Sequence, residues 1–541
     1  MRAGRARPLE ALARSGWALA AWVGLATVAA PGLLGLGHDN SPEVFFVRDD
    51  TALADYRSFT SRFSDFGALR VVAEGPGLWT REGLAWLGRV ERRAPGVRGV
   101  VAASGPSGAH PSETGGWPPA DPLAERDRLA AEPLARDMGW IASGGEAASL
   151  LLAVRRLAPG ERRRLLAELD DLLADRPPEV EARVVGIAAV NRALDRAVGA
   201  TLAILFPLVV ALGAAAIALA LRSGRDTALP LLVAALTQTV IFGTMGHLGV
   251  AFSIVTSILP LLLFVLALAT VLHLLLAVRE ERRAGLAPEA AVAAAYRRKA
   301  WPVLWTGLTT GIGFGSLAIS DSPPVRALGL WAAFGIAVLL AAAFTLCPAL
   351  LARSRPPRPA PRTPFERRGR RLGATAAGLA TRRPAAVHLL FLLTLLGALA
   401  GVPRLEVETG VLEYFRPGHP ARAGLEALEA KGVGAVSAEL LITLPGGSFE
   451  SAAAGGRLGR LGDRLRAAPS ALGVVTAADL PSADPELARR ARPLLLADGG
   501  ATTRVVIFLP FAGFTRLEPL FAEARAAAAA AFPEATVTLT G

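Results

Sequence analysis

Residues 227–278 read TALPLLVAALTQTVIFGTMGHLGVAFSIVTSILPLLLFVLALATVLHLLLAV, a run of 52 residues without one Asp, Glu, Lys or Arg. A helix that crosses the ~30 Å hydrocarbon core of a bilayer needs about 20 residues at ~1.5 Å each. The run is therefore long enough for two transmembrane helices. Gly246, His247, Leu248 and Gly249 lie near its middle and predict the turn between them.

Five shorter windows are also free of charged residues, and each is long enough for one span. They cover residues 15–38, 197–221, 300–320, 327–352 and 384–403. The first follows several arginines, so a signal peptide is an alternative there, but 24 uncharged residues exceed the 7–15 of a signal-peptide core. We therefore expect an uncleaved helix and, in total, a polytopic α-helical membrane protein with seven transmembrane helices.

The overall composition agrees with a membrane protein. Of 541 residues, 52% are hydrophobic and 19% charged, with a mean hydropathy of +0.41. One cysteine, Cys347, excludes an intrachain disulfide and a cysteine-based metal site. The sequence contains no Gly-x-Ser-x-Gly elbow, no HExxH and no phosphate loop after a soluble strand. We expect no enzymatic activity, no catalytic residues, no metal and no cofactor.

The distribution of the basic residues predicts the orientation. With the N-terminus in the cytoplasm, the four cytoplasmic segments carry 22 of the 58 Lys and Arg residues and six acids. They hold a net charge of +16, although the whole chain carries only +12. Topology thus accounts for the basic excess, and no nucleic-acid partner is expected. We predict a multi-pass protein of the inner (plasma) membrane whose two large segments are extracytoplasmic.

These two segments have matching patterns. In each, four short β-rich runs alternate with helical patterns, and the third and fourth runs of the two copies differ by 354 and 355 residues. This spacing predicts an internal repeat and two α+β domains of the split βαβ type. The expected units are an N-tail with the first helix (1–38), an outer domain (39–196), a block of five helices (197–352), a basic cytoplasmic loop (353–383), a seventh helix (384–403) and a second outer domain (404–541).

The repeat carries an expectation about length. The first copy runs from Gly186 into the five-helix block, whereas the sequence stops at the equivalent Gly541. A second five-helix block would therefore be missing, so that the second repeat is truncated or the chain is half of a split pair.

Residues 309–317, TTGIGFGSL, are similar to the TTxxGFxSL segment of resistance-nodulation-division (RND) transporters, more narrowly of the MMPL and sterol-sensing-domain (SSD) branch. The run 348–351 (PALL) and His273-Leu274-Leu275 fit the same resemblance. It implies porter-like outer domains, twelve helices in two repeats, proton-driven export of lipids or other hydrophobic molecules, and oligomers.

The same segment has a physical interpretation. Gly307, Gly311 and Gly315 recur every four residues and place a glycine stripe on one helix face. Small residues allow close approach between helices in lipid, so the stripe predicts a packing face. The other motif residues singled out as candidates are Thr309, Thr310, Gly313 and Phe314.

A proton-coupled pump needs an ionisable side chain at membrane depth. In the family, an aspartate on the fourth helix, a few residues before a histidine, has this role. Here the matching positions hold Ala269 and Thr270 before His273, and the predicted spans contain no acid. Thr270 and His273, three residues apart on one helix, remain the proton-relay candidates. The alternative is a neutral histidine that bonds to a neighbouring helix.

Two functions remain open at this stage. The first is an RND/MMPL-type transporter that exports hydrophobic or lipid-like molecules, with proton coupling in doubt. The second is a non-transporting, SSD-like lipid-binding or accessory subunit, or an inactive remnant. The expected partners are membrane lipids, a hydrophobic cargo, and either a separate C-terminal half or further copies of the chain.

Overall fold

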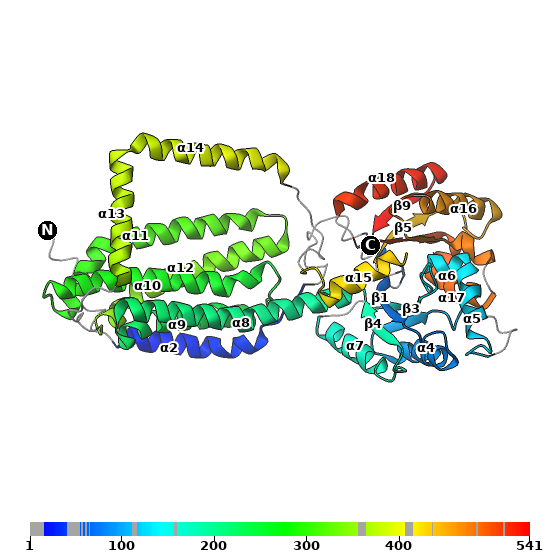
Figure 1. Ribbon diagram of the computed structural model, residues 1–541, viewed down its shortest axis with the longest axis horizontal. Coiled ribbons are helices and arrows are strands. Elements are labelled where there is room, and N and C mark those ends of the chain that lie inside the picture. The colour runs from blue at the N-terminus through cyan, green and yellow to red at the C-terminus, as the bar shows by residue number, and fades with distance from the viewer. Residues whose placement is uncertain are drawn as a thin grey trace.

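A computed structural model gives the arrangement of the chain (Figure 1). A bundle of long helices forms one end of the molecule, and two small β-sheets with their helices form the other. The structure describes residues 16–40, 55, 58–59, 62–63, 65–110, 116–155, 159–354, 364–405, 415–434, 436–482, 485–511 and 514–540.

Within the described residues, seven helices are long and apolar enough to cross a membrane, which is the number predicted. They are α2 (Trp17–Ala29) with η1 (Ala30–Gly35), α8 (Ile187–Leu221), α9 (Gly224–His247), η5 (Thr256–Ile258) with α10 (Leu259–Arg283), α11 (Pro288–Gly315) with η6 (Ser316–Ile319), α12 (Pro323–Leu351), and α14 (Pro384–Gly401) with η7 (Val402–Arg404). We call α2 and α8 to α12 the helical block.

Local sequence sets where these helices begin and end. Pro288, Pro323 and Pro384 stand at the first positions of α11, α12 and α14, where a missing N–H costs nothing. The α9 helix ends at His247, and Gly249 follows with a left-handed φ of +66°. The turn predicted at 246–249 is therefore present.

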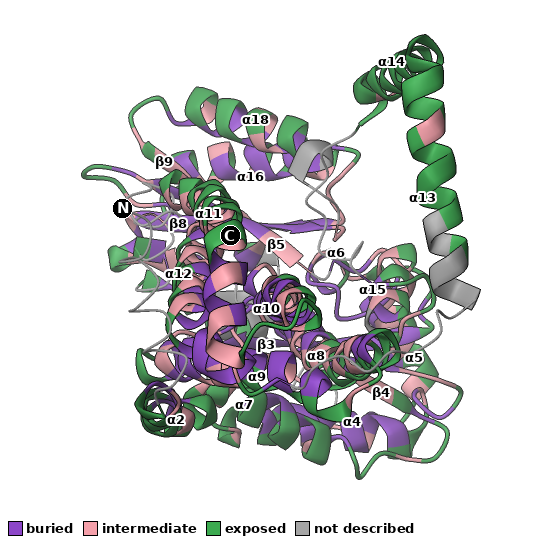
Figure 2. Cartoon of the chain, turned by 90° about the vertical axis from the view of Figure 1, so that its left-hand side faces the viewer, coloured by how far each residue is buried: buried purple, intermediate pink, exposed green. Residues whose placement is uncertain are grey.

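The predicted basic loop 353–383 contains a helix that the sequence reading did not anticipate. In its described part, α13 (Pro364–Arg382) runs across the direction of the bundle helices and leads into α14 (Figure 1). The α14 helix stands apart from the helical block, and its residues are exposed up to Ala400 (Figure 2). The described block therefore packs without this seventh span.

Lobe 1 (residues 65–185) has a four-stranded antiparallel sheet with the strand order β2-β3-β1-β4. Its strands are β1 (Asp65–Glu74), β2 (Val100–Ser104), β3 (Ala147–Val154) and β4 (Glu181–Val185), and its helices are α4 (Arg81–Arg93), α5 (Pro122–Ala131), α6 (Pro133–Asp137) and α7 (Pro159–Leu172). This order is that of a split βαβ unit.

Lobe 2 (residues 415–540) repeats the arrangement, with the order β6-β8-β5-β9. Its strands are β5 (Val436–Thr443), β6 (Gly473–Val475), β8 (Thr502–Leu509) and β9 (Thr536–Thr540), and its helices are α15 (Pro420–Ala430), α16 (Ala452–Arg466), α17 (Pro485–Leu495) and α18 (Phe514–Ala531). The short β7 (Leu496–Ala497) pairs with β8 and has no predicted counterpart. The matching topologies support the predicted internal repeat.

The two sheets meet face to face. In each lobe, one face is covered by the lobe's own helices and encloses a separate apolar core. Leu151 and Ala153 of β3 belong to another buried cluster, together with Val506 and Phe508 of β8. Apolar burial thus joins the lobes to each other as well as stabilising each one.

Candidate functional site

The glycine stripe of α11 faces α12. A methyl group at Gly307 would lie 2.5 Å from Leu340, one at Gly311 would lie 3.4 Å from Ile336, and one at Gly315 would lie 3.7 Å from Ala333. The distance from the added methyl group to the nearest α12 side chain decreases from Gly315 to Gly307. The α11 and α12 helices therefore approach each other closely along the stripe. Gly313 lies off this face, with nothing within 4 Å of an added methyl.

The remaining motif residues lie in different surroundings. The Thr309 and Thr310 hydroxyls donate to carbonyls one turn earlier in their own helix; Thr309 is exposed and Thr310 is half-buried. Phe314 instead lies at a tight crossing, where a methyl group on Gly329 of α12 would meet its carbonyl oxygen at 2.6 Å. The motif therefore builds a helix–helix contact rather than a polar site.

Replacing Gly329 by alanine is expected to destabilise this crossing by about 1–3 kcal/mol, because a backbone carbonyl cannot move aside as a side chain can. Gly313→Ala is the matched control, since its methyl meets open space and alanine favours the helix by about 1 kcal/mol. Thermal unfolding in detergent, followed by tryptophan fluorescence, measures both variants. Equal melting temperatures for the two would contradict the close crossing.

Thr270 and His273 lie on α10. Thr270 is half-buried and His273 is exposed, on a stripe that also holds the exposed Val265 and Leu276. In the described part of the chain, no hydrogen bond joins them to each other or to another helix, and His273 forms no ion pair. The structure therefore does not bring the relay candidates together with a second ionisable group, and their role stays a prediction.

The helical block does contain a buried ion pair, which the sequence reading missed. Asp226, 1% exposed, lies in the first turn of α9, where Ser223 caps its backbone N–H. A guanidinium nitrogen of Arg279 in α10 lies 3.4 Å from its carboxylate. The same guanidinium donates to the carbonyl of Leu221, at the end of α8.

This pair joins three helices at the end of the block that faces away from the lobes (Figure 1). The sequence analysis counts both residues only among the charges of the cytoplasmic segments, because they border the charge-free windows. Two features of the sequence could have indicated the pair. Asp226 stands in the first turn of a helix, where an acid is favourable, and Arg279 is the first cation after the long apolar run.

Arg279→Leu is expected to lower the free energy of unfolding by about 3–5 kcal/mol, because it leaves Asp226 buried without its cation. The double variant Asp226→Leu/Arg279→Leu should recover much of that loss, since apolar replacements of a buried pair are often tolerated. A double-mutant cycle of thermal unfolding separates the two effects. If the double variant loses as much as the sum of the singles, the two residues are not coupled.

Asn40 joins three parts of the helical block at its end nearest the lobes. Its amide donates to Asp195 of α8 and accepts from the backbone N–H of Ile254, both at 2.6 Å. Next to it, backbone hydrogen bonds pair the segment after η1 with the loop that contains Phe252. One buried side chain thus holds together the end of the first span, the start of α8 and the loop between α9 and α10.

Two buried arginines interlock the lobes. Arg70 of β1 is fully buried, donates to the carbonyl of Gly434 in lobe 2 at 2.9 Å and lies 4.7 Å from the ring of Phe508. Arg504 of β8 in turn lies 4.9 Å from the ring of Phe59, which precedes lobe 1. Stacking of guanidinium on aromatic rings is favourable where water is excluded.

Different groups compensate the positive charges of the two arginines. Arg504 forms a two-pronged ion pair with Glu439, at 2.7 and 2.8 Å. Arg70 donates to neutral acceptors, the Met138 carbonyl and the Ser149 hydroxyl. Burial lowers the pKa of Arg70 to about 9. The lobe interface therefore holds a positive charge that is compensated by dipoles and by the Phe508 ring.

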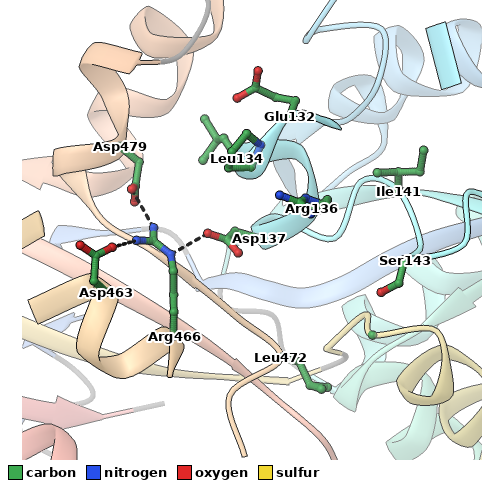
Figure 3. A pocket seen from close by; sticks show the side chains of 12 residues that line it. Glu132, Leu134, Arg136, Asp137, Ile141, Ser143, Asp463, Arg466, Leu472 and Asp479 are labelled. Atoms are coloured by element: carbon green, nitrogen blue, oxygen red, sulfur yellow. Dashed lines mark hydrogen bonds and ion pairs between the residues drawn. The ribbon is translucent and has the colours of Figure 1, made fainter. Parts of the chain in front are cut away.

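A cavity of about 640 Å³ opens between the lobes (Figure 3). At its wall, Arg466 of lobe 2 forms ion pairs with three aspartates: Asp137 of lobe 1 at 2.8 Å, and Asp463 and Asp479 of lobe 2 at 3.0 and 2.7 Å. Charged side chains dominate the lining, so the cavity suits a polar group better than an apolar one.

The electrostatics of this cluster depend on Arg466. Burial raises the pKa of Asp137; Arg466 opposes that rise, and the neighbouring Asp479 adds to it. Burial alone would lower the pKa of Arg466, but Asp479 and Asp137 raise it above its ordinary value. The guanidinium is therefore charged at every physiological pH and holds Asp137 across the gap between the lobes.

Arg466→Gln should make folding stability depend on pH. Without the guanidinium, the pKa of Asp137 in the folded protein rises further, so the folded state binds a proton more readily than the unfolded state. Stability then falls as pH rises through the interval between the two pKa values. We expect a loss of about 1–3 kcal/mol at neutral pH and a smaller loss in mildly acidic buffer.

Thermal unfolding at the two pH values tests this expectation. Arg136→Gln is the matched control, because Arg136 lines the same cavity, is exposed, and lowers the pKa of Asp137 less than Arg466 does. A loss in Arg466→Gln that is the same at both pH values, or that Arg136→Gln reproduces, would argue against the cluster.

Comparison with known proteins identifies the region around the helical block. Residues 129–387, from α5 to the start of α14, match the model of the MMPL family. The curated "Putative membrane protein MJ1562" of Methanocaldococcus jannaschii is 27% identical over 201 residues, which cover 36% of this chain and 51% of that protein. The chain thus spans about half the length of the curated relative it matches.

Proposed function

Because residues 129–387 belong to the MMPL family, we propose that this membrane protein is an RND-type transporter that exports hydrophobic or lipid-like molecules. The family match carries the proposal. It covers the motif at 309–317 and all five helices from α8 to α12. The resemblance inferred from that motif is confirmed by the match.

The connection between block and lobes supports a transport cycle. The α8 helix has 35 residues, so that it extends for about 50 Å. Its first turns pack into the lobes through Ala188, Val190 and Leu194, and its last turns pack into the block through Ile217 and Leu221. A tilt of α8 in the membrane would therefore move lobe 1, and Asn40 ties the start of α8 to the end of the first span.

We place the block in the plasma membrane with the N-terminus in the cytoplasm and both lobes outside. The described basic residues at the α8–α9 turn and the α10–α11 turn support this orientation, since they lie at the end of the block away from the lobes. The arginines before residue 16, which were counted in the prediction, lie outside the described residues.

Efflux of a lipophilic dye such as Nile red from cells that make the chain tests transport. We expect lower dye accumulation than in cells with empty vector. Asn40→Ala should abolish the difference while the protein remains folded, because it releases α8 and the Ile254 loop from the end of the first span. Unchanged accumulation with the native chain would remove the proposal.

Ser257→Ala is the matched control for Asn40→Ala. Its hydroxyl donates to the Ile254 carbonyl in the same loop, at 2.7 Å. The change removes one local hydrogen bond without touching α8, so efflux should persist. Loss of efflux in both variants would show that the loop, and not the Asn40 link, is required.

A second function, an SSD-like lipid-binding or accessory subunit, is favoured by one observation. Thr270 replaces the aspartate that the family uses, and His273 forms no ion pair in the described helices. Lipid binding that is insensitive to pH and to Thr270→Asp would support this function. Efflux that appears only in Thr270→Asp would instead indicate a pump that has lost its coupling residue. Neither function is enzymatic.

The proposed partners follow from the exposed surfaces. The α14 helix is exposed along its length, and the outward face of α10 carries His273 between apolar residues. Lipid contacts part of this surface. We propose that another protein surface, from a separate C-terminal half or a second copy of the chain, contacts the rest.

A further inference from the structure

The α13 helix is strongly amphipathic. By the 3.6-residue helical period, Leu372, Ala376 and Leu379 lie on one face. Positions 367, 370, 371 and 382, all arginine, lie on the remaining surface. The sequence therefore encodes one apolar face and one strongly basic face.

The apolar face is not covered by the described protein. Leu372 is 72% exposed and Leu379 is 51% exposed. Two large apolar side chains one above the other would face water unless something else covers them. Arg371 and Arg382 on the basic side are exposed too. Arg368, one turn before Leu372, borders the apolar face and is also exposed, so that its long side chain can reach the headgroups from there.

The direction of the helix indicates what covers that face. The α14 span begins at Pro384, immediately after α13, and the chain turns sharply at Arg383. Figure 2 looks along the bundle: α8, α10 and α14 are seen nearly end-on, and α13 is seen from the side. Because the bundle axis crosses the bilayer, α13 runs parallel to the membrane plane at the level where α14 enters it.

We propose that α13 is a membrane-surface helix that binds anionic lipid headgroups. Its apolar face enters the boundary between headgroups and acyl chains, and its arginines contact the phosphates around it. Continuity with a membrane span and the excess of arginine over the single acid Glu366 favour a lipid surface over a protein partner. Anionic lipid would then fix the angle between α13 and α14.

The test uses the full chain in nanodiscs of phosphatidylcholine, alone or with one-third phosphatidylglycerol. Cysteines at Leu372→Cys and Leu379→Cys carry an environment-sensitive fluorophore, in a Cys347→Ala background that removes the buried native thiol. Thr381→Cys is the control, since position 381 lies on the opposite face and is exposed. Quenchers on the lipid chains and iodide in the buffer report the two environments.

We expect lipid-chain quenching at positions 372 and 379 and iodide quenching at 381. Phosphatidylglycerol should strengthen lipid-chain quenching at least twofold, and either high salt or Arg371→Gln/Arg382→Gln should reverse that gain. Equal iodide quenching on both faces would overturn the proposal. So would indifference to phosphatidylglycerol, or protection of position 379 from both quenchers, which would mean that protein covers the face.

Discussion

The structure depends on one constraint: inside a bilayer, each backbone N–H and C=O must find its partner within the protein. A helix meets this requirement through its own backbone hydrogen bonds. The charge-free windows therefore form helices irrespective of which apolar side chains they carry. In the described part of the chain, sheets form only in the lobes, where water can satisfy their edges. The same requirement explains why prolines stand at the first positions of α11, α12 and α14, because the missing N–H has no partner to lose there.

Polar side chains join the structural elements outside the hydrocarbon core, at the ends of the bundle and between the lobes. Asp226 and Arg279 join three helices at one end, and Asn40 joins the end of the first span, the start of α8 and the Ile254 loop at the other. Arg70 and Arg466 then connect lobe 1 to lobe 2. Together with the shared apolar cluster between the sheets, these contacts make the two lobes a single body that α8 can move.

The sequence predicted what depends on patterns along the chain. Seven spans and four strands per lobe follow from apolar length and from β-rich runs, and the strand orders agree with the predicted split βαβ units. Arg70 could not be assigned its role, because its acceptor Gly434 is 364 residues away and belongs to another lobe. Asp226 was counted only among the charges of the cytoplasmic segments, since its burial depends on where α10 places Arg279. The α13 helix was missed because the arginines of 353–383 were interpreted mainly as orientation signals, with anionic-lipid contact as a second interpretation, and not as part of a helix.

The α10 helix connects the relay question to the question of partners. Its outward face is apolar at Val265 and Leu276, as lipid requires, yet His273 lies between them. A polar ring in hydrocarbon costs free energy unless it is hydrogen-bonded, and the described helices offer it no such bond. A protein surface that hydrogen-bonds the ring would remove that cost. The exposed position of His273 therefore argues against a relay between helices of this chain, because the ring does not face the interior of the helical block.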